Sequence, residues 1–218
     1  MKLDLPSSPL ADVDPEFEKV GVETAQLVFA LAGTNMREKL LQNLTQDICR
    51  SQLGLPFRMH VTAASMHGLC YADLLAAIRF IAPYAGYPAA ADALGRVRQI
   101  ADEIGMDTAD VGETPSGPVE SADTIATADD WMTMFLHSRI SRAWSEHRLS
   151  SREKAIIAIT SDVSGQTLAE SFRHHVGLAL DAGVSKDQLR DVVRFCAEHS
   201  LARAVAALRE LDAVLDEY

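Results

Sequence analysis

The sequence predicts an all-α fold, and three observations lead to that prediction. Apolar residues recur at the three- and four-residue spacing of a helix face through most of the chain. Helix-capping residues and Gly or Pro residues separate these stretches. A long segment also recurs 115 residues further along the chain, which indicates two tandem, pseudo-symmetric helical repeats.

The first two expected helices lie in the N-terminal part of the chain. Asp14 is a good N-cap and Pro15 suits the first helical position, so an amphipathic helix is expected to run from here toward Gly33. A second helix is expected to begin near Met36.

Two matching segments form the centre of the repeat. Residues 57–68 read FRMHVTAASMHG, and residues 172–183 read FRHHVGLALDAG. Each places a histidine, His60 or His175, on an apolar helical stripe. Because a buried imidazole without a partner is costly, each histidine is expected either to be hydrogen-bonded inside the protein or to face a cavity. The residues alone leave packing and catalysis both open.

Further helices are expected after each of these segments. An apolar helix is predicted over residues 71–82, and the Gly and Pro of YAGYPAAADAL mark a turn into an Ala-rich helix that ends near Gly105. The helices expected in the rest of the chain lie over residues 129–144, from Ser150 or Ser151 with Glu153 as capping partner, from Ser185 with Gln188 as capping partner, and over residues 202–215.

The repeat predicts how the chain is divided. Arg37–Ala82 aligns with Arg152–Ala197 without a gap, and sixteen of the forty-six positions are identical. Residues 106–127 between the copies are small, acidic and rich in Gly, Pro, Ser and Thr, as in a linker. We therefore expect an N-terminal repeat over residues 1–105 and a C-terminal repeat over residues 128–218, packed as pseudo-symmetric halves around one core.

The charge and composition of the chain argue against nucleic-acid binding, membrane insertion and export. The chain carries 20 Lys+Arg against 31 Asp+Glu, a net charge of −11. No basic cluster offsets this acidity, so we expect no nucleic-acid partner. No apolar stretch approaches the ~18 residues of a membrane span, and none follows a basic N-terminus, so neither membrane insertion nor export is expected.

The three cysteines, Cys49, Cys70 and Cys196, fit neither a disulfide framework nor a Cys-x-x-Cys motif. Reduced thiols and a cytoplasmic location are expected. The histidine spacing suits neither zinc nor a di-iron carboxylate site, and the chain has no Gly-rich phosphate loop. We therefore expect no metal and no cofactor.

Several side chains near the repeated histidines are further site candidates. Arg58 and Arg173 precede the histidines by two residues, and both a structural role and anchorage of a substrate carboxylate are open for them. Glu170 and His174 form an i, i+4 pair that occurs only in the second copy. Tyr84, beside a turn, is a candidate to reach a pocket.

Two aspartates occur at identical places in the repeat. Asp47 and Asp162 lie mid-helix among apolar residues, a position that does not favour aspartate. We expect each to make a buried hydrogen bond to the other repeat.

The spacing of His60, Ala64 and Gly68, followed by Y-x-G-x-P-A-A at residues 84–90, resembles the carboxymuconolactone decarboxylase family. The wider superfamily includes the alkylhydroperoxidase D proteins. The second copy keeps the spacing from His175 but not the Gly-Pro turn. The resemblance implies an all-α helical bundle and a ring oligomer. Because members with one repeat assemble as hexamers, a chain with two repeats is expected to form a homotrimer.

The chain also departs from this family. The peroxidase branch carries Cys-x-x-Cys before the histidine, where this chain has Leu53 and Pro56 or Leu168 and Ser171. Peroxide reduction through thiols is therefore not expected. The decarboxylase branch has a glutamate four residues before the histidine, again at Pro56 and Ser171. The acid or base that usually assists the histidine is thus missing, or displaced by one residue, as in Glu170.

The sequence and the resemblance together favour a cofactor-independent, decarboxylase-like lyase that acts by proton transfer on a small carboxylated or lactone-like metabolite. His175 with Glu170, and His60 with Tyr84, are the expected acid or base groups, and Arg173 or Arg50 would orient a substrate carboxylate. Decarboxylation, isomerisation and cyclisation all remain open.

The alternative is a non-catalytic oligomeric or small-ligand-binding protein on the same fold. A structure separates the two hypotheses, because an enzyme is expected to place His60 or His175 in a cavity with convergent polar groups. Histidines that are enclosed by core side chains and bonded only to backbone would favour the alternative.

Overall fold

The computed structural model describes residues 8–113 and 128–218, and within these ranges the chain is all-α, as predicted, and contains no strand. None of the described helices is long and apolar enough to cross a membrane. The elements are η1 Pro9–Asp12, α1 Pro15–Phe29, α2 Met36–Cys49, α3 Leu55–Met66, α4 Tyr71–Ala85, α5 Tyr87–Ile104, α6 Asp130–Trp144, α7 Ser151–Gly165, α8 Glu170–Asp181, α9 Lys186–Phe195, η2 Cys196–Glu198 and α10 Leu201–Leu215.

Capping side chains start the helices where the sequence predicts them. The carboxylate of Asp14 accepts hydrogen bonds from two backbone N–H groups in the first turn of α1. Ser150 and Glu153 form a capping box at the start of α7, and Ser185 and Gln188 form one at the start of α9. Each cap satisfies N–H groups that the first helical turn leaves unpaired, which fixes the helix start.

The end of α4 differs from the sequence prediction. The helix continues past residue 82 to Ala85 and includes Pro83. Pro83 cannot donate the usual backbone hydrogen bond, but the N–H of Gly86 still bonds to the carbonyl of Ala82 at 3.0 Å, so the last turn closes. The break between α4 and α5 is made by Gly86, whose φ of 94° favours glycine.

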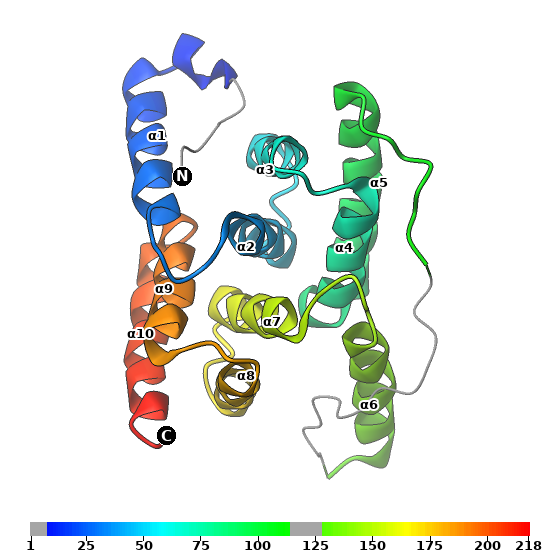
Figure 1. Cartoon of the computed structure of the whole chain (residues 1–218), viewed down its shortest axis with the longest axis vertical. Coiled ribbons are helices and arrows are strands. Elements are labelled where there is room, and N and C mark those ends of the chain that lie inside the picture. The colour runs from blue at the N-terminus through cyan, green and yellow to red at the C-terminus, as the bar shows by residue number, and fades with distance from the viewer. Residues whose placement is uncertain (1–7, 114–127) are drawn as a thin grey trace.

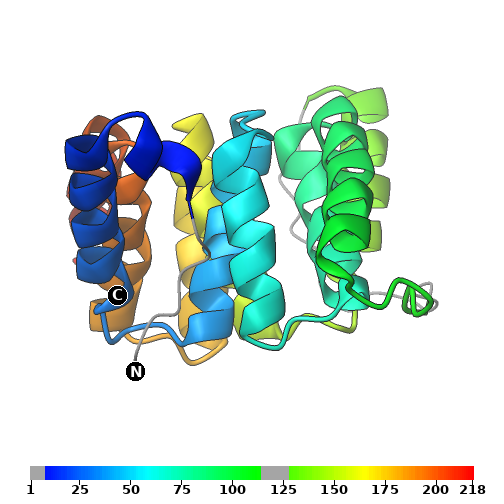
Figure 2. The same ribbon diagram turned by 90° about the horizontal axis from the view of Figure 1, so that it is seen from above.

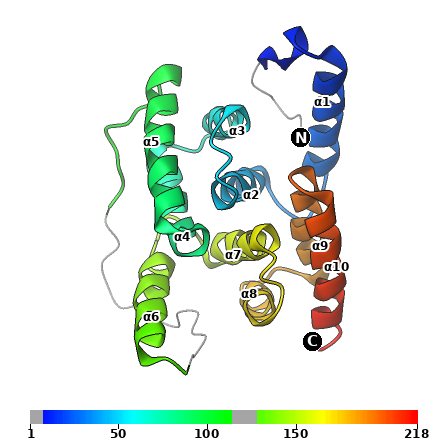
Figure 3. The same cartoon turned by 180° about the vertical axis from the view of Figure 1, so that it is seen from behind.

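The helices form three groups. Figure 1 shows α2, α3, α7 and α8 end-on in the centre, flanked by α1, α9 and α10 on one side and by α4, α5 and α6 on the other. Figure 2 shows the central helices lengthwise, and Figure 3 shows the same three groups from behind. Each flanking group therefore mixes helices from the two halves of the chain.

The helices of the two halves correspond in order and spacing. The bounds of α6 and of α8 lie 115 residues after those of α1 and of α3, and α7 and α9 begin 115 residues after α2 and α4. Helix α10 begins 114 residues after α5, which agrees with a one-residue deletion in the aligned sequences. We interpret this correspondence as a duplication.

Two arginines connect the halves in a reciprocal way. Nε of Arg37 donates to Glu153 at 2.7 Å, and Nε of Arg152 donates to Glu38 at 2.7 Å. Each guanidinium also donates to a backbone carbonyl of the opposite half. The same pair of bonds made in both directions is the pattern expected across a pseudo-twofold axis.

The described chain has two apolar clusters rather than the one core that the sequence predicts, one built mainly from α2 to α5 and the other from α7 to α10. Helices α2 and α7 pack along each other between the clusters, the most extensive contact between any two described helices. Nearly every residue of these two helices is buried, polar ones included. Gln42 on α2 is an example, because its amide donates to Thr160 at 3.1 Å and to the carbonyl of Val192 at 3.0 Å. Such an environment can hold a buried carboxylate only if partners surround it.

The predicted linker is only partly described. Residues 106–113 contain no helix, and residues 114–127 lie outside the described residues. The division into repeats at residues 105 and 128 stays a prediction.

Candidate active site

Each repeated histidine is hydrogen-bonded to an aspartate of the preceding helix. Nδ1 of His60 lies 2.6 Å from Oδ2 of Asp47, and Nδ1 of His175 lies 2.5 Å from Oδ2 of Asp162. Because an ionised carboxylate only accepts hydrogen bonds, we assign the proton of each pair to Nδ1 of the imidazole. In the neutral ring Nε2 is then an acceptor, which is the state of a general base.

Asp47 is fully buried in α2 and keeps its negative charge. Burial by itself would raise the pKa of Asp47, but hydrogen bonds from His199 and His60 outweigh it and hold the pKa below its usual value. Nε2 of His199 lies 3.3 Å from Oδ1 of Asp47, so Asp47 makes the bond to the other half that the sequence predicts.

Asp162 does not follow that prediction, because its second oxygen is occupied within its own half. Oδ1 of Asp162 accepts hydrogen bonds from the hydroxyls of Thr167 at 2.6 Å and Ser171 at 2.7 Å. The first copy has Gln52 and Pro56 at these positions. Neither supplies a hydroxyl, which leaves the second oxygen of Asp47 open to a partner from the other half.

A cavity of about 350 Å³ opens beside His60. It lies between α1 with η1 on one side and α2 with α3 on the other, and η2 adds further wall residues. Most of its wall is apolar, formed by Leu10, Phe17, Val22, Ala25, Phe29, Leu40, Leu55, Pro56, Met59 and Ala63. The polar or charged residues that line it are Glu18, Asn43, Asp47, Gln52, His60, Glu198 and His199.

Three of these polar side chains have buried atoms without a hydrogen-bond partner in the described chain. These atoms are both amide atoms of Asn43, Nδ1 of His199 and Oε2 of Glu198. Leaving buried polar atoms unpaired is costly, and native proteins seldom do so away from functional sites. The polar lining of the cavity therefore offers hydrogen bonds to a ligand or to water.

Glu198 is the third titratable group near His60. Burial raises the pKa of Glu198, while the nearby charges of His60 and His199 act in the opposite direction and the charge of Asp47 adds to the rise. The shift favours the uncharged carboxylic acid, which can donate a hydrogen bond. The cavity thus combines a base, His60, with a potential acid, Glu198.

The site is assembled from both halves of the chain. Glu198 ends η2 and His199 follows it, whereas Asp47 and His60 lie on α2 and α3. Glu198 has a counterpart in the first half. When the one-residue deletion is taken into account, Glu198 aligns with Tyr84. The Tyr84 ring packs against that of His175, with centroids 5.6 Å apart. Each repeated histidine therefore meets a residue from the opposite half.

Comparison with known proteins gives one family. The model of the Carboxymuconolactone decarboxylase family matches residues 129–213. This confirms the family resemblance for residues 129–213, the part of the chain that contains His175. The matched part, α6 to α10, contains the Asp162–His175 pair and also supplies Glu198 and His199 to the cavity of His60. No curated protein matches the chain.

The three arginines that the sequence predicted as carboxylate anchors do not line this cavity. Arg58 pairs with Glu103 on α5. Arg173 pairs with Glu217, a hydrogen bond that raises the pKa of Arg173. NH1 of Arg50 donates to the carbonyl of His199 at 3.0 Å, so Arg50 holds η2 in place. These contacts support structural roles for all three arginines.

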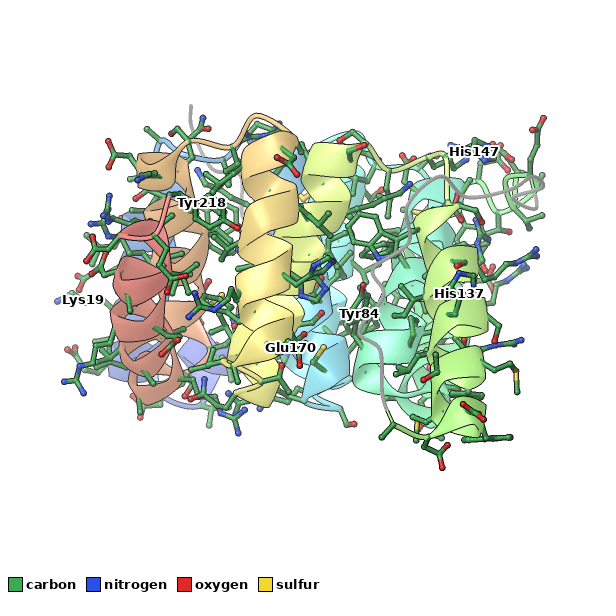
Figure 4. The ribbon with its side chains drawn as sticks, turned by 90° about the horizontal axis from the view of Figure 1, so that it is seen from below. Lys19, Tyr84, His137, His147, Glu170 and Tyr218 are labelled. Carbon is green, nitrogen blue, oxygen red and sulfur yellow. The ribbon has the colours of Figure 1, made fainter. Side chains whose placement is uncertain are left out.

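The other candidates gather around His175 rather than His60. The ring centroid of His174 lies 5.9 Å from that of His175. The hydroxyl of Tyr84 accepts a hydrogen bond from Nε1 of Trp144 at 2.8 Å. Glu170 is exposed in the first turn of α8, and Figure 4 shows it on that helix with Tyr84 between α8 and α6. Asp162, rather than Glu170, holds Nδ1 of His175.

Asp47, His60 and His199 also contain the donor types of a two-histidine, one-carboxylate metal site, with one donor atom of each within 4.8 Å of the others. Two ligands of one tetrahedral zinc ion would be separated by about 3.3 Å, given the usual ligand bond lengths. The 2.6 Å between His60 and Asp47 is shorter than that and is typical of a hydrogen bond. As arranged, these residues fit a shared proton better than a metal ion.

The cysteines give no indication of thiol chemistry. Burial raises the pKa of Cys49 to about 11 and that of Cys196 to about 12, so both remain protonated thiols at neutral pH. Cys70 is exposed, and its thiol donates to Asp73 at 3.3 Å. The three cysteines are unpaired, as the sequence predicts.

Proposed function

We propose that the chain is an enzyme that transfers a proton at a carbon next to a carbonyl group in a small lactone-like or enolisable metabolite, without a cofactor. The observation that carries this proposal is the His60–Asp47 pair beside a cavity that also holds Glu198. Decarboxylase-like chemistry is what the family match suggests at a coarser level. Decarboxylation, isomerisation and cyclisation all pass through an enolate, so one site of this kind serves any of them.

In the proposed mechanism His60 is the general base. Its Nε2 takes the proton as the C–H bond breaks, and the electron pair of that bond moves to the carbonyl oxygen. Asp47 keeps the ring in the required tautomer and stabilises the imidazolium that forms, as a buried carboxylate does for a catalytic histidine. Glu198 in its uncharged form donates its proton to the oxygen where negative charge develops. Return of both protons completes the turnover.

We assign the reaction to His60 rather than to His175. The side chain of His60 is 18% exposed and lines the cavity, whereas that of His175 is 1% exposed. The Asp162–His175 pair, with Thr167 and Ser171, has the character of a buried structural network. This reverses the weight that the sequence gave to the second copy.

We also propose that the chain forms a homo-oligomer, with the trimer expected from the family as the specific form. Large apolar side chains are exposed on α1 and on the corresponding outer helix α6: Phe17, Val20, Leu27, Trp131, Met134 and Phe135. Exposed apolar residues gathered on one element are typical of a subunit contact. Light scattering on the purified chain gives the mass directly, and a monomer would contradict this proposal.

A substrate screen tests the enzymatic role. The chain is incubated with a panel of lactones, hydroxy-ketones and other enolisable carbonyl compounds, and products are detected by mass spectrometry. His60→Gln and Glu198→Gln are expected to lower turnover by about 10²- to 10⁴-fold, the usual contribution of a general acid or base. Circular dichroism and oligomer mass should be unchanged. Turnover that survives in His60→Gln would contradict the assignment, and His175→Gln is the matched control.

A further inference from the structure

The charge of the cavity lining limits what the cavity accepts. Among the described residues that line it there is no lysine and no arginine, while Glu18 and Asp47 are acidic and Glu198 adds a carboxyl group that the proposed mechanism uses in its uncharged form. Asp47 is ionised and fully buried. A substrate carboxylate placed here would face a like charge in a medium of low dielectric constant, without a cation to compensate.

The arginines that the sequence offered as anchors do not change this balance. Arg58 and Arg173 are paired with acidic side chains elsewhere, and Arg50 is held by a backbone carbonyl. His60 and His199 each donate to the same carboxylate, so their nearest charge is already negative. The cavity therefore disfavours anions.

The side-chain amide of Asn43 can form hydrogen bonds with an uncharged polar group of a ligand. Its side chain is fully buried, it lines the cavity, and neither amide atom has a partner among the described residues. It lies one helical turn before Asp47 on α2, so both point from the same face of the helix. An amide supplies two N–H donors and one carbonyl acceptor, which suits a ligand that carries both a carbonyl oxygen and a hydroxyl or enol.

We propose that the His60 cavity binds an uncharged hydroxy-carbonyl compound or lactone with an apolar body, that Asn43 recognises its polar end, and that carboxylates are rejected. The apolar wall accommodates the body of the molecule. This inference rests on the proposed function only for the location of the site.

The inference also narrows the reaction. An uncharged substrate has no carboxylate to lose as carbon dioxide, so the reaction at this cavity is an isomerisation or cyclisation through an enol. The C–H proton passes to Nε2 of His60 while the carbonyl oxygen takes the proton of Glu198, which gives an enol. His60 then donates its proton to a different carbon, and the Glu198 carboxylate takes back a proton from the enol or from a neighbouring hydroxyl, so that both groups are restored. Atoms and charge balance without any co-reactant.

Matched ligands test the inference. A butenolide acetic acid and its methyl ester differ in charge, and calorimetry with the full chain at neutral pH measures the binding of each, together with a panel of uncharged hydroxy-ketones. The uncharged compounds are expected to bind, and the acid to bind at least about 100-fold more weakly than its ester. An acid that binds as tightly as its ester overturns the inference, and so does failure of every uncharged compound to bind.

Two variants of α2 test the role of Asn43. Asn43→Leu keeps the approximate volume of the side chain but removes the amide, and ester binding is expected to weaken about tenfold or more. The control is Gln46→Leu, which removes another buried amide with an unpartnered nitrogen on the same helix but outside the cavity lining. Equal effects of the two variants would contradict a recognition role for Asn43.

A third variant separates this inference from the proposed function. His60→Gln keeps Asn43 and the apolar wall, so it is expected to bind the ester within about tenfold of the native chain, although it cannot transfer the proton. Binding by native and variant chains with no turnover by either would contradict the enzymatic proposal and leave the substrate class standing. Turnover of acids in preference to esters would contradict the substrate class and leave the enzymatic proposal standing.

Discussion

The ring of Tyr84 packs against the ring of His175, with centroids 5.6 Å apart, although the two residues belong to opposite halves of the chain. Glu198, which aligns with Tyr84, contributes to the wall beside His60. Each histidine site thus receives a side chain from the opposite half. The two sites differ because the aligned position is Tyr84 at one site and Glu198 at the other. The His60 site combines an acidic group from the other half, Glu198, with a cavity, whereas His175 meets the ring of Tyr84 and is 1% exposed.

Asp47 is expected to be essential for turnover without being essential for folding. Asp47→Asn keeps an oxygen acceptor, but it removes the charge that stabilises the imidazolium, so kcat should fall by about 10²- to 10⁴-fold. The control is Asp162→Asn, which changes the corresponding residue. Steady-state kinetics of both variants, with thermal melts, makes the comparison. Equal losses of kcat would contradict the assignment of the reaction to the first half.

The reciprocal arginine pairs should stabilise the contact between the halves. The side chain of Glu38 is 3% exposed, so Arg152→Ala leaves a nearly buried carboxylate without its partner. Because Arg152 is itself 25% exposed, we expect a loss of about 2 kcal/mol in the free energy of unfolding, less than for a fully buried pair. Urea denaturation measures it.

The control for Arg152 is Arg98, which pairs with Asp102 on the surface of α5 at 55% exposure. Arg98→Ala should leave the free energy of unfolding nearly unchanged, because solvent screens an exposed pair. Similar losses in the free energy of unfolding for the two variants would contradict a stabilising role of the Arg152–Glu38 pair beyond that of a surface pair.

Glu198 should make stability depend on pH in a defined direction. Because its pKa is raised in the folded chain, the unfolded chain loses this proton at lower pH than the folded chain does. The contribution of Glu198 to stability therefore falls as pH rises from the unfolded pKa to the folded pKa. Glu198→Gln removes this penalty, so the variant should gain stability relative to the native chain above about pH 5, with no gain below about pH 4. A stability difference that does not vary with pH would contradict the raised pKa.

The three cysteines should differ in reactivity. At pH 8 a thiol with a pKa of about 11, such as Cys49, is about one part in a thousand thiolate, and Cys196 with a pKa of about 12 is less ionised still. Cys70 is exposed. Brief alkylation followed by peptide mass spectrometry is expected to label Cys70 alone in the native chain and all three cysteines in urea. Labelling of Cys196 in the native chain would contradict its burial.

Much of the fold follows from local patterns in the sequence. The apolar periodicity predicted the helices, and the caps at Asp14, Ser150 and Ser185 predicted where three of them begin. These features succeed because they depend on residues a few positions apart. The turn at Gly86 was predicted, but the end of α4 was placed three residues early, because the sequence does not show that the hydrogen bond from Gly86 to Ala82 closes the last turn across Pro83.

The candidate site was predicted only in part. The repeat drew attention to His60 and to the buried Asp47, but the sequence did not show that the two are partners. Glu198, His199 and Asn43 were not predicted, because they reach the cavity only through the packing of the halves. The alignment of Glu198 with Tyr84 was the one available signal. The predicted arginine anchors depended on local spacing, which does not show that acidic side chains elsewhere pair with Arg58 and Arg173.

Proton exchange tests the central claim most directly, because it requires neither a known product nor a complete reaction. The native chain, His60→Gln and His175→Gln are each incubated in heavy water with uncharged enolisable lactones and ketones that bind, and loss of the signal of the proton next to the carbonyl is followed by NMR. We predict exchange with the native chain and with His175→Gln, and a loss of about 100-fold or more with His60→Gln. Exchange that continues in His60→Gln, or that is lost only in His175→Gln, would contradict the account.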